Sequence, residues 1–338
     1  MAMPTIIVTG ATGFVGQAVV RAAREHGYKV HALSRSKKHC PKSWAKDASI
    51  VFSELDLSDP EAVSTLGATI KKCDAVIHAA ATMSGNDALH QQDTVGPTRY
   101  LIQELCKLEK PPRFILVSSL SVYGYSAMPD WSTLDETTPV EIDLNHRDAY
   151  CRSKLAQEAL VINAVQSQGL TARIIRPGAI YDPNRKWTSR LGFSKGSRII
   201  CIGGDAPIPA IHVDHCAEVL VRAAIKNLNN NDIPIPLGTG QLEIINAVDP
   251  NAPTQKEWIN ARKSSVIYLP HRPLKLLIHF LTLAADLVPG IFKKLPTLFH
   301  EATFSARFKP LHYSTARLED RLDYSPELSF LEAITSEK

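Results

Sequence analysis

The chain has 338 residues, of which 44% are hydrophobic and 21% charged, a composition typical of a globular protein with one large domain or two smaller ones. Its net charge of +4, from 38 basic and 34 acidic residues, is too small and too evenly spread to indicate nucleic-acid binding. The six cysteines lack metal-ligand spacing and a strand is expected by Thr5, before any signal peptide could fit, so we expect reduced thiols, no metal and a cytoplasmic protein.

The first segments predict a strand, a glycine-rich turn and a helix. Residues 5–9 are mostly apolar, residues 10–16 contain glycine at 10, 13 and 16, and apolar residues then recur at helical spacing until Gly27. Glycine lets the backbone approach a pyrophosphate, and the helix N-terminus offers it free N–H groups. Although the commoner fingerprint is G-x-G-x-x-G, this context indicates a dinucleotide site.

The second expected strand, residues 29–33, ends in a basic turn. An NAD-selective site usually carries an acidic residue here, which binds the ribose 2′-hydroxyl. No acidic residue is present, and Arg35, nineteen residues after Gly16, suits a 2′-phosphate. We therefore favour NADP(H) as the cofactor and leave NAD(H), or a plain solvated turn, as alternatives.

Strands and helices continue to alternate. Further strands are expected at residues 49–52, 74–78, 114–117 and 172–176. One helix is expected to open at residues 56–59, another to span about 94–108, and a third to start at 150. This order predicts an α/β fold of the Rossmann type, with a doubly wound parallel sheet that binds its ligand at the carboxyl ends of the strands. The residues expected at these ends are Gly10, Arg35, Asp56, Ala79, Ser119 and Arg176.

Tyr150 and Lys154 are the most informative pair in the chain. They stand four residues apart at the start of an expected helix, so the phenol and the ammonium share one helix face. Of nine tyrosines, only this one has a lysine at that spacing. A nearby cation favours the phenolate, so the pair suits acid–base chemistry, although an ordinary amphipathic helix would also explain it.

The alternation breaks up from about residue 182. We expect a dinucleotide-binding domain from residues 1–181 and about 211–245, and a smaller, mainly helical substrate domain from about 182–210 and 246–338. Residues 235–240 are expected to form a strand that returns to the main sheet, and residues 250–338 to be mostly helical. Candidate substrate-pocket residues, each of which ordinary packing would also explain, are Tyr125, Met128, Trp131, Trp187 and Phe193.

Residues 273–290 form an oily segment whose polar residues make one narrow helical stripe. Four polar residues, two of them charged, argue against a membrane span. We expect this helix to pack in the core or to wall an apolar pocket, with contact to a membrane surface as the less favoured alternative.

Taken together, these residues resemble the extended short-chain dehydrogenase/reductase family, also called the NAD-dependent epimerase/dehydratase family. The matching motifs cover about residues 5 to 220, and residues 311–334 resemble the family's closing segment. Residues 268–297 resemble, more loosely, the hydroxysteroid dehydrogenase and ketoreductase-like branches. The motifs lie at residues 9–16, 56–57, 78–80, 117–119, 122–124, 150–154, 176–178, 181 and 211–214.

The resemblance implies three catalytic roles and a cofactor site. Tyr150 would exchange a proton with the substrate oxygen, and Lys154 would bind the nicotinamide ribose and lower the pKa of Tyr150. Ser119 would hydrogen-bond the same oxygen, with Ser118 as the alternative. The implied cofactor residues, Arg35 included, are Thr9, Gly10, Thr12, Gly13, Phe14, Val15, Gly16, Arg35, Asp56, Leu57, Ala79, Ala80, Ala81, Val117, Ser118, Tyr150, Lys154, Pro177, Gly178, Ala179 and Ile180.

One position departs from the family pattern. The family often has Asn where Thr94 stands, and a single hydroxyl cannot replace both the donor and the acceptor of an amide. A proton relay through this position is therefore in doubt. A homodimer through the helices that follow Thr94 and Tyr150 would be typical of the family.

The sequence thus predicts an NADP(H)-dependent oxidoreductase that moves hydride between nicotinamide and a carbonyl or secondary alcohol of a mostly apolar small molecule. A nucleotide-sugar epimerase or dehydratase with retained NAD is the first alternative, against which Arg35 and the oily segment argue. A non-catalytic nucleotide-sensing protein is the second, although such relatives generally lack the Tyr/Lys pair.

Overall fold

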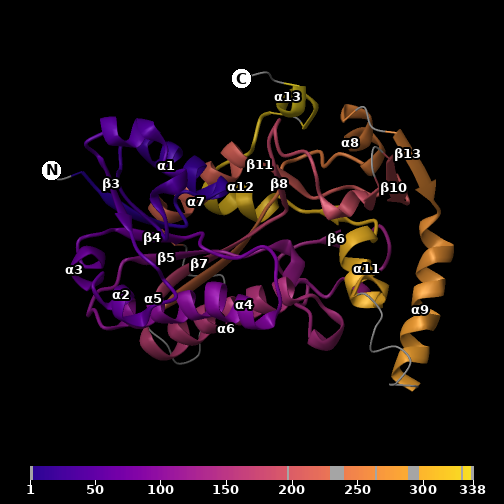
Figure 1. Ribbon diagram of the computed structural model, residues 1–338, viewed down its shortest axis with the longest axis horizontal. Coiled ribbons are helices and arrows are strands. Elements are labelled where there is room, and N and C mark those ends of the chain that lie inside the picture. Colours follow the sequence, from indigo (N-terminus) through magenta and orange to yellow (C-terminus); the bar gives the residue numbers. More distant parts are fainter. Residues whose placement is uncertain are drawn as a thin grey trace.

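Seven parallel strands form the central sheet of the protein, seen edge-on at the left of Figure 1. The computed structural model describes residues 3–195, 198–228, 240–262, 265–287, 297–328 and 330–335. The strand order is β12-β7-β5-β4-β1-β2-β3. The strands are β1 (Thr5–Thr9), β2 (Lys29–Ser34), β3 (Ile50–Glu54), β4 (Ala75–His78), β5 (Arg113–Val117), β7 (Thr171–Pro177) and β12 (Gln241–Ala247).

The strand order reverses between β1 and β4. The chain runs outward from β1 to β3, returns to place β4 on the other side of β1, and then continues outward to β12. Two connections that leave a parallel sheet in opposite directions open a crevice at the carboxyl ends of the strands. The expected α/β fold with a doubly wound parallel sheet is confirmed.

Helices cover both faces of this sheet because its strands are apolar on both sides. Along β1, Ile6 and Val8 pack into one core and Ile7 into the other. The first face carries α1 (Phe14–Glu25), α7 (Val213–Ile225) and α12 (Ala316–Leu322). The second carries α2 (Pro60–Ser64), α3 (Gly67–Ile70), α4 (Asp87–His90), α5 (Gly96–Cys106) and α6 (Ala149–Gln168).

A smaller region lies beyond the carboxyl ends of the strands, at the right of Figure 1. Its three-stranded sheet, β13-β10-β9, packs with α8 and α13 around buried Trp258. The elements are β9 (Phe193–Lys195), β10 (Arg198–Ile202), α8 (Gln255–Ala261), β13 (Ser265–Leu269), α9 (His271–Leu287), α11 (Glu301–Phe308) and α13 (Phe330–Thr335). Two short pairs, β8 (Ala179–Tyr181) with β11 (Ala210–His212) and β6 (Thr133–Leu134) with β14 (His312–Tyr313), connect the regions.

Some boundaries differ from the sequence-based expectation. The helix expected from Thr94 is a π-helical turn, Gln91–Val95, followed by α5. The strand expected at 235–240 falls outside the described residues except for Gly240, and the strand that pairs with β7 starts at Gln241. The C-terminal part also holds β13 and β14, so it is less purely helical than its composition suggested.

Helix α9, which carries most of the oily segment, has an unexpected orientation. Two residues of its polar stripe contact the rest of the protein, since Lys275 Nζ lies 3.0 Å from Asp130 Oδ1 and His279 Nδ1 lies 2.7 Å from Glu301 Oε2. Residues 288–290 lie outside the described part of the chain.

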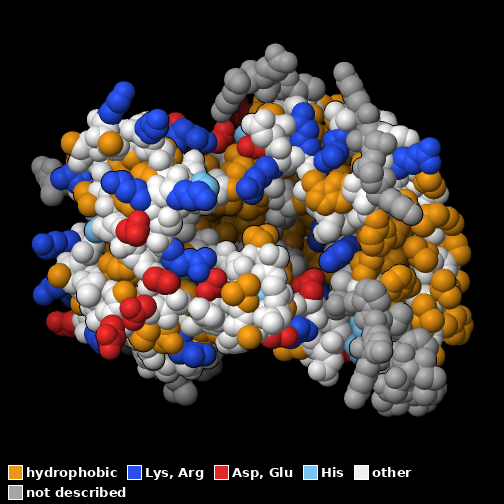
Figure 2. Space-filling model, in the orientation of Figure 1, with side chains coloured by type: hydrophobic (Ala, Val, Ile, Leu, Met, Phe, Trp, Pro, Cys, Tyr) orange, Lys and Arg blue, Asp and Glu red, His pale blue; other side chains and the backbone are white. Residues whose placement is uncertain are grey.

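The apolar side of α9 is consequently divided between the core and the solvent. Ile278 and Leu274 pack against Phe304 and Phe308. The exposed apolar side chains, which form the broad hydrophobic surface at the right of Figure 2, are Leu276, Leu277, Phe280 and Leu283, with 47–66% of their surface accessible. The prediction that the helix is buried or walls a pocket is wrong for these four. None of the described helices is long and apolar enough to cross a membrane.

Candidate active site

The glycine turn between β1 and α1 leaves no room for side chains at two positions. Gly10 has φ +64°, and a Cβ there would lie 2.9 Å from the backbone N of Ala80. A Cβ on Gly16 would lie 2.1 Å from the carbonyl oxygen of Gly10. The turn is therefore pressed against the end of β4, and the start of α1 stays open to a ligand. An anion that approaches this helix N-terminus meets backbone N–H groups, as a dinucleotide pyrophosphate requires.

A cavity of about 1330 Å³ runs from this turn to the smaller region, and its mouth appears as the hollow near the centre of Figure 2. The expected cofactor residues on its wall, besides Tyr150 and Lys154, are Gly10, Gly13, Phe14, Val15, Gly16, Ala79, Ala81, Val117, Ser118, Pro177, Gly178, Ala179 and Ile180. An adjoining pocket of about 220 Å³ is lined by the others, which are Thr12, Arg35, Asp56, Leu57 and Ala80. Thr9 lines neither, because it is fully buried beneath the turn.

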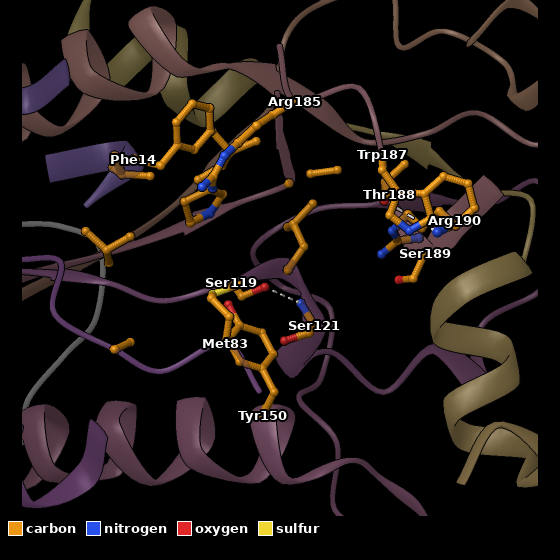
Figure 3. Close-up of a pocket in the computed structure, with 18 of the residues that line it drawn as sticks. Phe14, Met83, Ser119, Ser121, Tyr150, Arg185, Trp187, Thr188, Ser189 and Arg190 are labelled. Atoms are coloured by element: carbon orange, nitrogen blue, oxygen red, sulfur yellow. Dashed lines mark hydrogen bonds between the residues drawn. The ribbon is translucent and has the colours of Figure 1, made fainter. Parts of the chain in front are cut away.

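Tyr150 lies in the first turn of α6 and points up toward Ser119 (Figure 3). Asp148 caps this helix, since its carboxylate accepts a hydrogen bond from the backbone N of Cys151 at 2.9 Å. Burial raises the pKa of Tyr150 to about 12, although a hydrogen bond with the Ser119 side chain acts in the opposite direction. The phenol therefore holds its proton at neutral pH.

The structure distinguishes the two neighbouring serines. Ser118 Oγ donates a 2.5 Å hydrogen bond to Glu158, which also accepts two hydrogen bonds from Arg176 at 2.6 and 2.9 Å. Ser119 Oγ accepts a hydrogen bond from the backbone N of Ser121 at 3.1 Å and caps the next turn, Leu120–Val122. Ser118 is therefore committed to a buried ion pair, whereas the Ser119 hydroxyl lines the cavity beside Tyr150.

Lys154 is buried beside Tyr150, with Nζ 5.9 Å from the centroid of the phenol ring. The ammonium donates hydrogen bonds to Val117 O at 2.8 Å and to Gln157 Oε1 at 3.0 Å. Burial lowers the pKa of Lys154 to about 8, and the Glu158 carboxylate partly offsets this shift. We expected Lys154 to lower the pKa of Tyr150. The pKa of Tyr150 is raised instead, because burial of the phenol is the larger effect.

Behind Lys154 runs a buried polar chain that the sequence analysis missed. Gln157 Nε2 donates to Thr98 Oγ1 at 2.6 Å, and this hydroxyl lies 3.0 Å from His78 Nε2. His78 Nδ1 lies 2.8 Å from Thr9 Oγ1, beneath the glycine turn. Burial lowers the pKa of His78 to about 3, so the ring is neutral. One of its two nitrogens therefore donates a hydrogen bond to its threonine neighbour and the other accepts one.

Thr94, at the position where the family often has Asn, does not contact Lys154 through its side chain. Its hydroxyl accepts a hydrogen bond from the backbone N of Thr82 at 2.9 Å, and its carbonyl oxygen lies 3.4 Å from Gln157 Nε2. The amide that contacts the lysine in this chain is therefore Gln157. Its position three residues after Lys154 on the same helix was the available sequence signal.

Arg35 lines the smaller pocket and forms an ion pair there with an acidic residue. Its Nη1 lies 2.8 Å from Asp93 Oδ2, a carboxylate on the π-helical turn that lines the same pocket. The arginine side chain is 60% exposed and the aspartate 11%. A 2′-phosphate or a 2′-hydroxyl would find a partner here, since the pocket offers both a guanidinium and a carboxylate.

Only one of the five candidate substrate residues lines the large cavity. Trp187 lines the large cavity, but Tyr125, Met128, Trp131 and Phe193 do not. Tyr125 and Met128 belong to a buried cluster around η5 (Tyr125–Ala127), while Trp131 and Phe193 are 47% and 40% exposed away from the cavity. Sequence reasoning missed the basic lining residues Arg147, Arg185, Lys186, Arg190, Arg262 and Arg307. Within the described residues, no group of three or more His, Cys, Asp or Glu could hold a metal ion.

The turn, the sheet and the Tyr150 helix recur in known proteins. The family model for the NAD dependent epimerase/dehydratase family matches residues 6–235. The chain belongs to this family, whose members bind a nicotinamide cofactor.

Two relatives in the NAD dependent epimerase/dehydratase family are oxidoreductases by name. Cinnamoyl-CoA reductase 2 of Arabidopsis thaliana is 25% identical over 186 residues, which cover 53% of this chain and 55% of that protein. A decarboxylating sterol-4-alpha-carboxylate 3-dehydrogenase of Dictyostelium discoideum is 33% identical over 239 residues, which cover 68% of this chain and 70% of that one. The chain thus spans little more than half the length of the cinnamoyl-CoA reductase.

Among solved structures, the UDP-Glc/GlcNAc 4-epimerase of Campylobacter jejuni has the same overall fold. The TM-score is 0.71 at 19% identity, and the match covers 98% of this chain and 96% of that one. Identity this low speaks for the fold and not for the substrate.

Proposed function

We propose that the protein is an NADP(H)-dependent oxidoreductase that interconverts a carbonyl and a secondary alcohol on a small molecule with a largely apolar body. The observation that carries this proposal is the meeting of Tyr150, Ser119 and Lys154 on one cavity wall with the glycine turn at its far end. The names of the reductase and dehydrogenase relatives support it. Residues 1–181 and 211–245 would bind the cofactor, and the remainder would cover the substrate.

The residues of this chain suit the two ends of the cofactor. The crowded turn at Gly10 and Gly16 would receive the pyrophosphate, and the pocket of Asp56 and Leu57 the adenine. Pro177 and its neighbours would lie beside the nicotinamide. The bound cofactor would supply or accept the hydride.

Tyr150 and Ser119 would act on the substrate oxygen. In the reductive direction, Tyr150 donates its proton to the carbonyl oxygen while the Ser119 hydroxyl hydrogen-bonds the same atom. The Lys154 ammonium stabilises the phenolate that forms. Burial raises the pKa of Tyr150, so the phenol carries its proton at neutral pH and can act as the proton donor in this direction.

Substitution Tyr150→Phe tests the assignment. We expect turnover to fall by roughly 10²- to 10⁴-fold, because the proton donor is lost while the ring remains. Cofactor binding, followed by fluorescence titration, should change less than roughly twofold, because the aromatic ring and all other cofactor residues remain. Turnover equal to that of the wild type would refute the role of Tyr150.

The preference for NADP(H) rests on Arg35. We expect Arg35→Ala to weaken NADPH binding about tenfold, the scale of one charge-assisted hydrogen bond to phosphate, and to leave NADH binding nearly unchanged. The control is Lys38→Ala, which removes an exposed cation of the same turn that lines neither cavity. Equal losses of NADPH affinity in both variants would show that Arg35 acts only through the positive charge of the turn and not through a specific contact to the phosphate.

One observation favours a second candidate, a nucleotide-sugar epimerase or dehydratase with retained NAD. Asp93 beside Arg35 is a carboxylate of the kind that binds a ribose 2′-hydroxyl. Denaturing the purified protein and identifying the released dinucleotide separates the two. Exchangeable NADP(H) supports the reductase, whereas tightly retained NAD(H) supports the epimerase.

A further inference from the structure

The wall of the large cavity is strongly cationic. Seven of its described lining residues are Lys or Arg, and Asp148 is the single carboxylate among them. Buried or half-buried charges are costly unless they are paired. The question is which of these cations already have partners within the protein.

Five of the seven have contacts within the protein, although only Arg147 among these five pairs with a carboxylate of the described residues. Arg147 is 2% exposed and pairs with Glu141 at 3.2 Å, and Lys154 contacts Val117 and Gln157 as described. Arg185 lies over the Phe14 ring at the cofactor end, 4.4 Å from its centroid.

Two more cations bind backbone oxygens and not carboxylates. Lys186 Nζ donates to Ile334 O at 3.2 Å, and Arg262 Nη1 donates to Lys186 O at 2.7 Å. Arg190 and Arg307 remain.

Arg190 is held in place by neutral groups. Its Nη2 donates to the Tyr125 hydroxyl at 3.1 Å and its Nη1 lies 3.4 Å from the Tyr313 hydroxyl. Within the described part of the chain it makes no ion pair. In Figure 3, Arg190 lies beside Trp187 and Ser189, on the side of the view opposite Phe14, and Tyr150 and Ser119 lie below both.

Arg307, on α11, lies close to the catalytic helix. Its Nη2 is 4.0 Å from Asp148 Oδ2, the cap of α6 and two residues before Tyr150. Burial lowers the pKa of Arg307 and the positive charges of Arg190 and Arg147 lower it further, while Asp148 raises it. Arg307 therefore has one long contact to a carboxylate and lies near enough to Arg190 for the second guanidinium to oppose its charge, and both arginines line the cavity.

We propose that Arg190 and Arg307 bind an oxyanion of the substrate, a carboxylate or a phosphate, while the carbonyl lies against Tyr150 and Ser119. This deepens the proposed oxidoreductase function and rests on it for the identity of the reacting group. Guanidinium groups match both oxyanions in geometry, and an anion bound by both would supply the negative charge that Arg190 lacks and that Arg307 has only at 4.0 Å. The substrate would then have an apolar body and an acidic group.

Matched substrates test this inference. We would compare 3-oxooctanoate, its methyl ester and 3-oxooctanoyl-CoA with the wild type, Arg307→Gln, Arg307→Lys and Arg190→Gln. The wild type should prefer one anionic substrate over the ester in kcat/KM by roughly tenfold or more, the scale of a charge-assisted hydrogen bond. The preference should fall at least about tenfold in both glutamine variants and be partly kept in Arg307→Lys. Preference for the acid would indicate a carboxylate, and preference for the CoA ester a phosphate.

Two further readouts keep the inference testable if a variant does not fold or no substrate turns over. The anion preference of the wild type should decline with added salt. Calorimetric titration with octanoate and with inorganic pyrophosphate should detect binding that Arg307→Gln or Arg190→Gln weakens. The control for both is Arg272→Gln, an exposed cation of α9 that does not line the cavity.

The outcomes separate this inference from the proposed function. Anion binding that depends on the two arginines, without turnover of any carbonyl, would support the oxyanion site and count against the oxidoreductase. Turnover of acid, CoA ester and methyl ester at equal kcat/KM, with no detectable binding of either anion, would overturn the oxyanion site and leave the oxidoreductase standing.

Discussion

The two ends of the large cavity are built in different ways. At the cofactor end, backbone forms the wall: the glycine turn packs on residues 79–81, and 177–180 run alongside. At the substrate end, long side chains form it, chiefly Trp187, Arg190 and Arg307. A backbone wall is specified by steric fit and tolerates little change. A wall of long side chains is specified by charge and contact, so single substitutions should tune it and not destroy it.

The largest expected effect is at the backbone wall. In Gly16→Ala the new Cβ would lie 2.1 Å from Gly10 O and 2.7 Å from Ala11 Cα, and neither backbone atom can move aside alone. Because the turn would have to shift by an ångström or so, we expect cofactor binding to weaken by at least about 100-fold. Fluorescence titration with NADPH measures this effect.

The matched control is Gly67→Ala in α3, where a Cβ meets no atom within 4 Å. This variant should bind cofactor like the wild type and change in stability by no more than about 1 kcal/mol. If Gly16→Ala bound NADPH as well as the wild type does, the turn would be adaptable. The backbone wall would then tolerate substitution as well as the side-chain wall does.

A smaller effect is expected where the two ends meet, at Lys154. Gln157→Leu removes a hydrogen bond to the charged form of Lys154 and should lower its pKa below the present value of about 8. The lysine needs its charge to stabilise the phenolate and loses it as the pH rises through its pKa. The alkaline decline in kcat/KM should therefore begin at lower pH, with a loss of roughly tenfold at neutral pH.

Gln166→Leu supplies the control for this pH profile, because Gln166 lies on the exposed side of the same helix. Its profile should match that of the wild type. A Gln157→Leu profile that also matches would mean that Lys154 is held by Val117 alone.

The smallest effect is expected among the aromatic residues of the side-chain wall. Trp187 lines the cavity and lies 5.4 Å from the Arg262 guanidinium, so Trp187→Ala should raise KM several-fold, about 1 kcal/mol, with little change in kcat. Phe193→Ala should leave KM within about twofold, since Phe193 is 40% exposed and lines no part of the cavity. Steady-state kinetics with one carbonyl substrate distinguishes them, and equal effects would place the substrate elsewhere.

The same contrast explains how much could be predicted from the sequence. Gly10, Ala79, Ser119 and Pro177 come at or just after the ends of parallel strands, and such ends meet at one edge of a sheet. Local pattern therefore sufficed to predict both the fold and this edge.

The side-chain wall could not be predicted in this way. Arg190 and Arg307 are far apart in the sequence and come together only because η7 (Ser189–Leu191) contacts α11. Trp131 and Trp187 looked equally plausible as pocket residues, and their different positions depend on long-range packing. Helix α9 shows the same limit, because its polar stripe was predictable but not that Lys275 and His279 face the protein while four apolar side chains are exposed.

The orientation of α9 has a practical consequence at the bench. An exposed apolar band that includes Leu276, Leu277, Phe280 and Leu283 should adsorb to plastic, to air–water interfaces and to detergent micelles. Enzyme would be lost from dilute solutions on contact with the vessel. A fall in specific activity on dilution would then measure adsorption and not the dissociation of subunits, and carrier protein in the assay buffer separates the two.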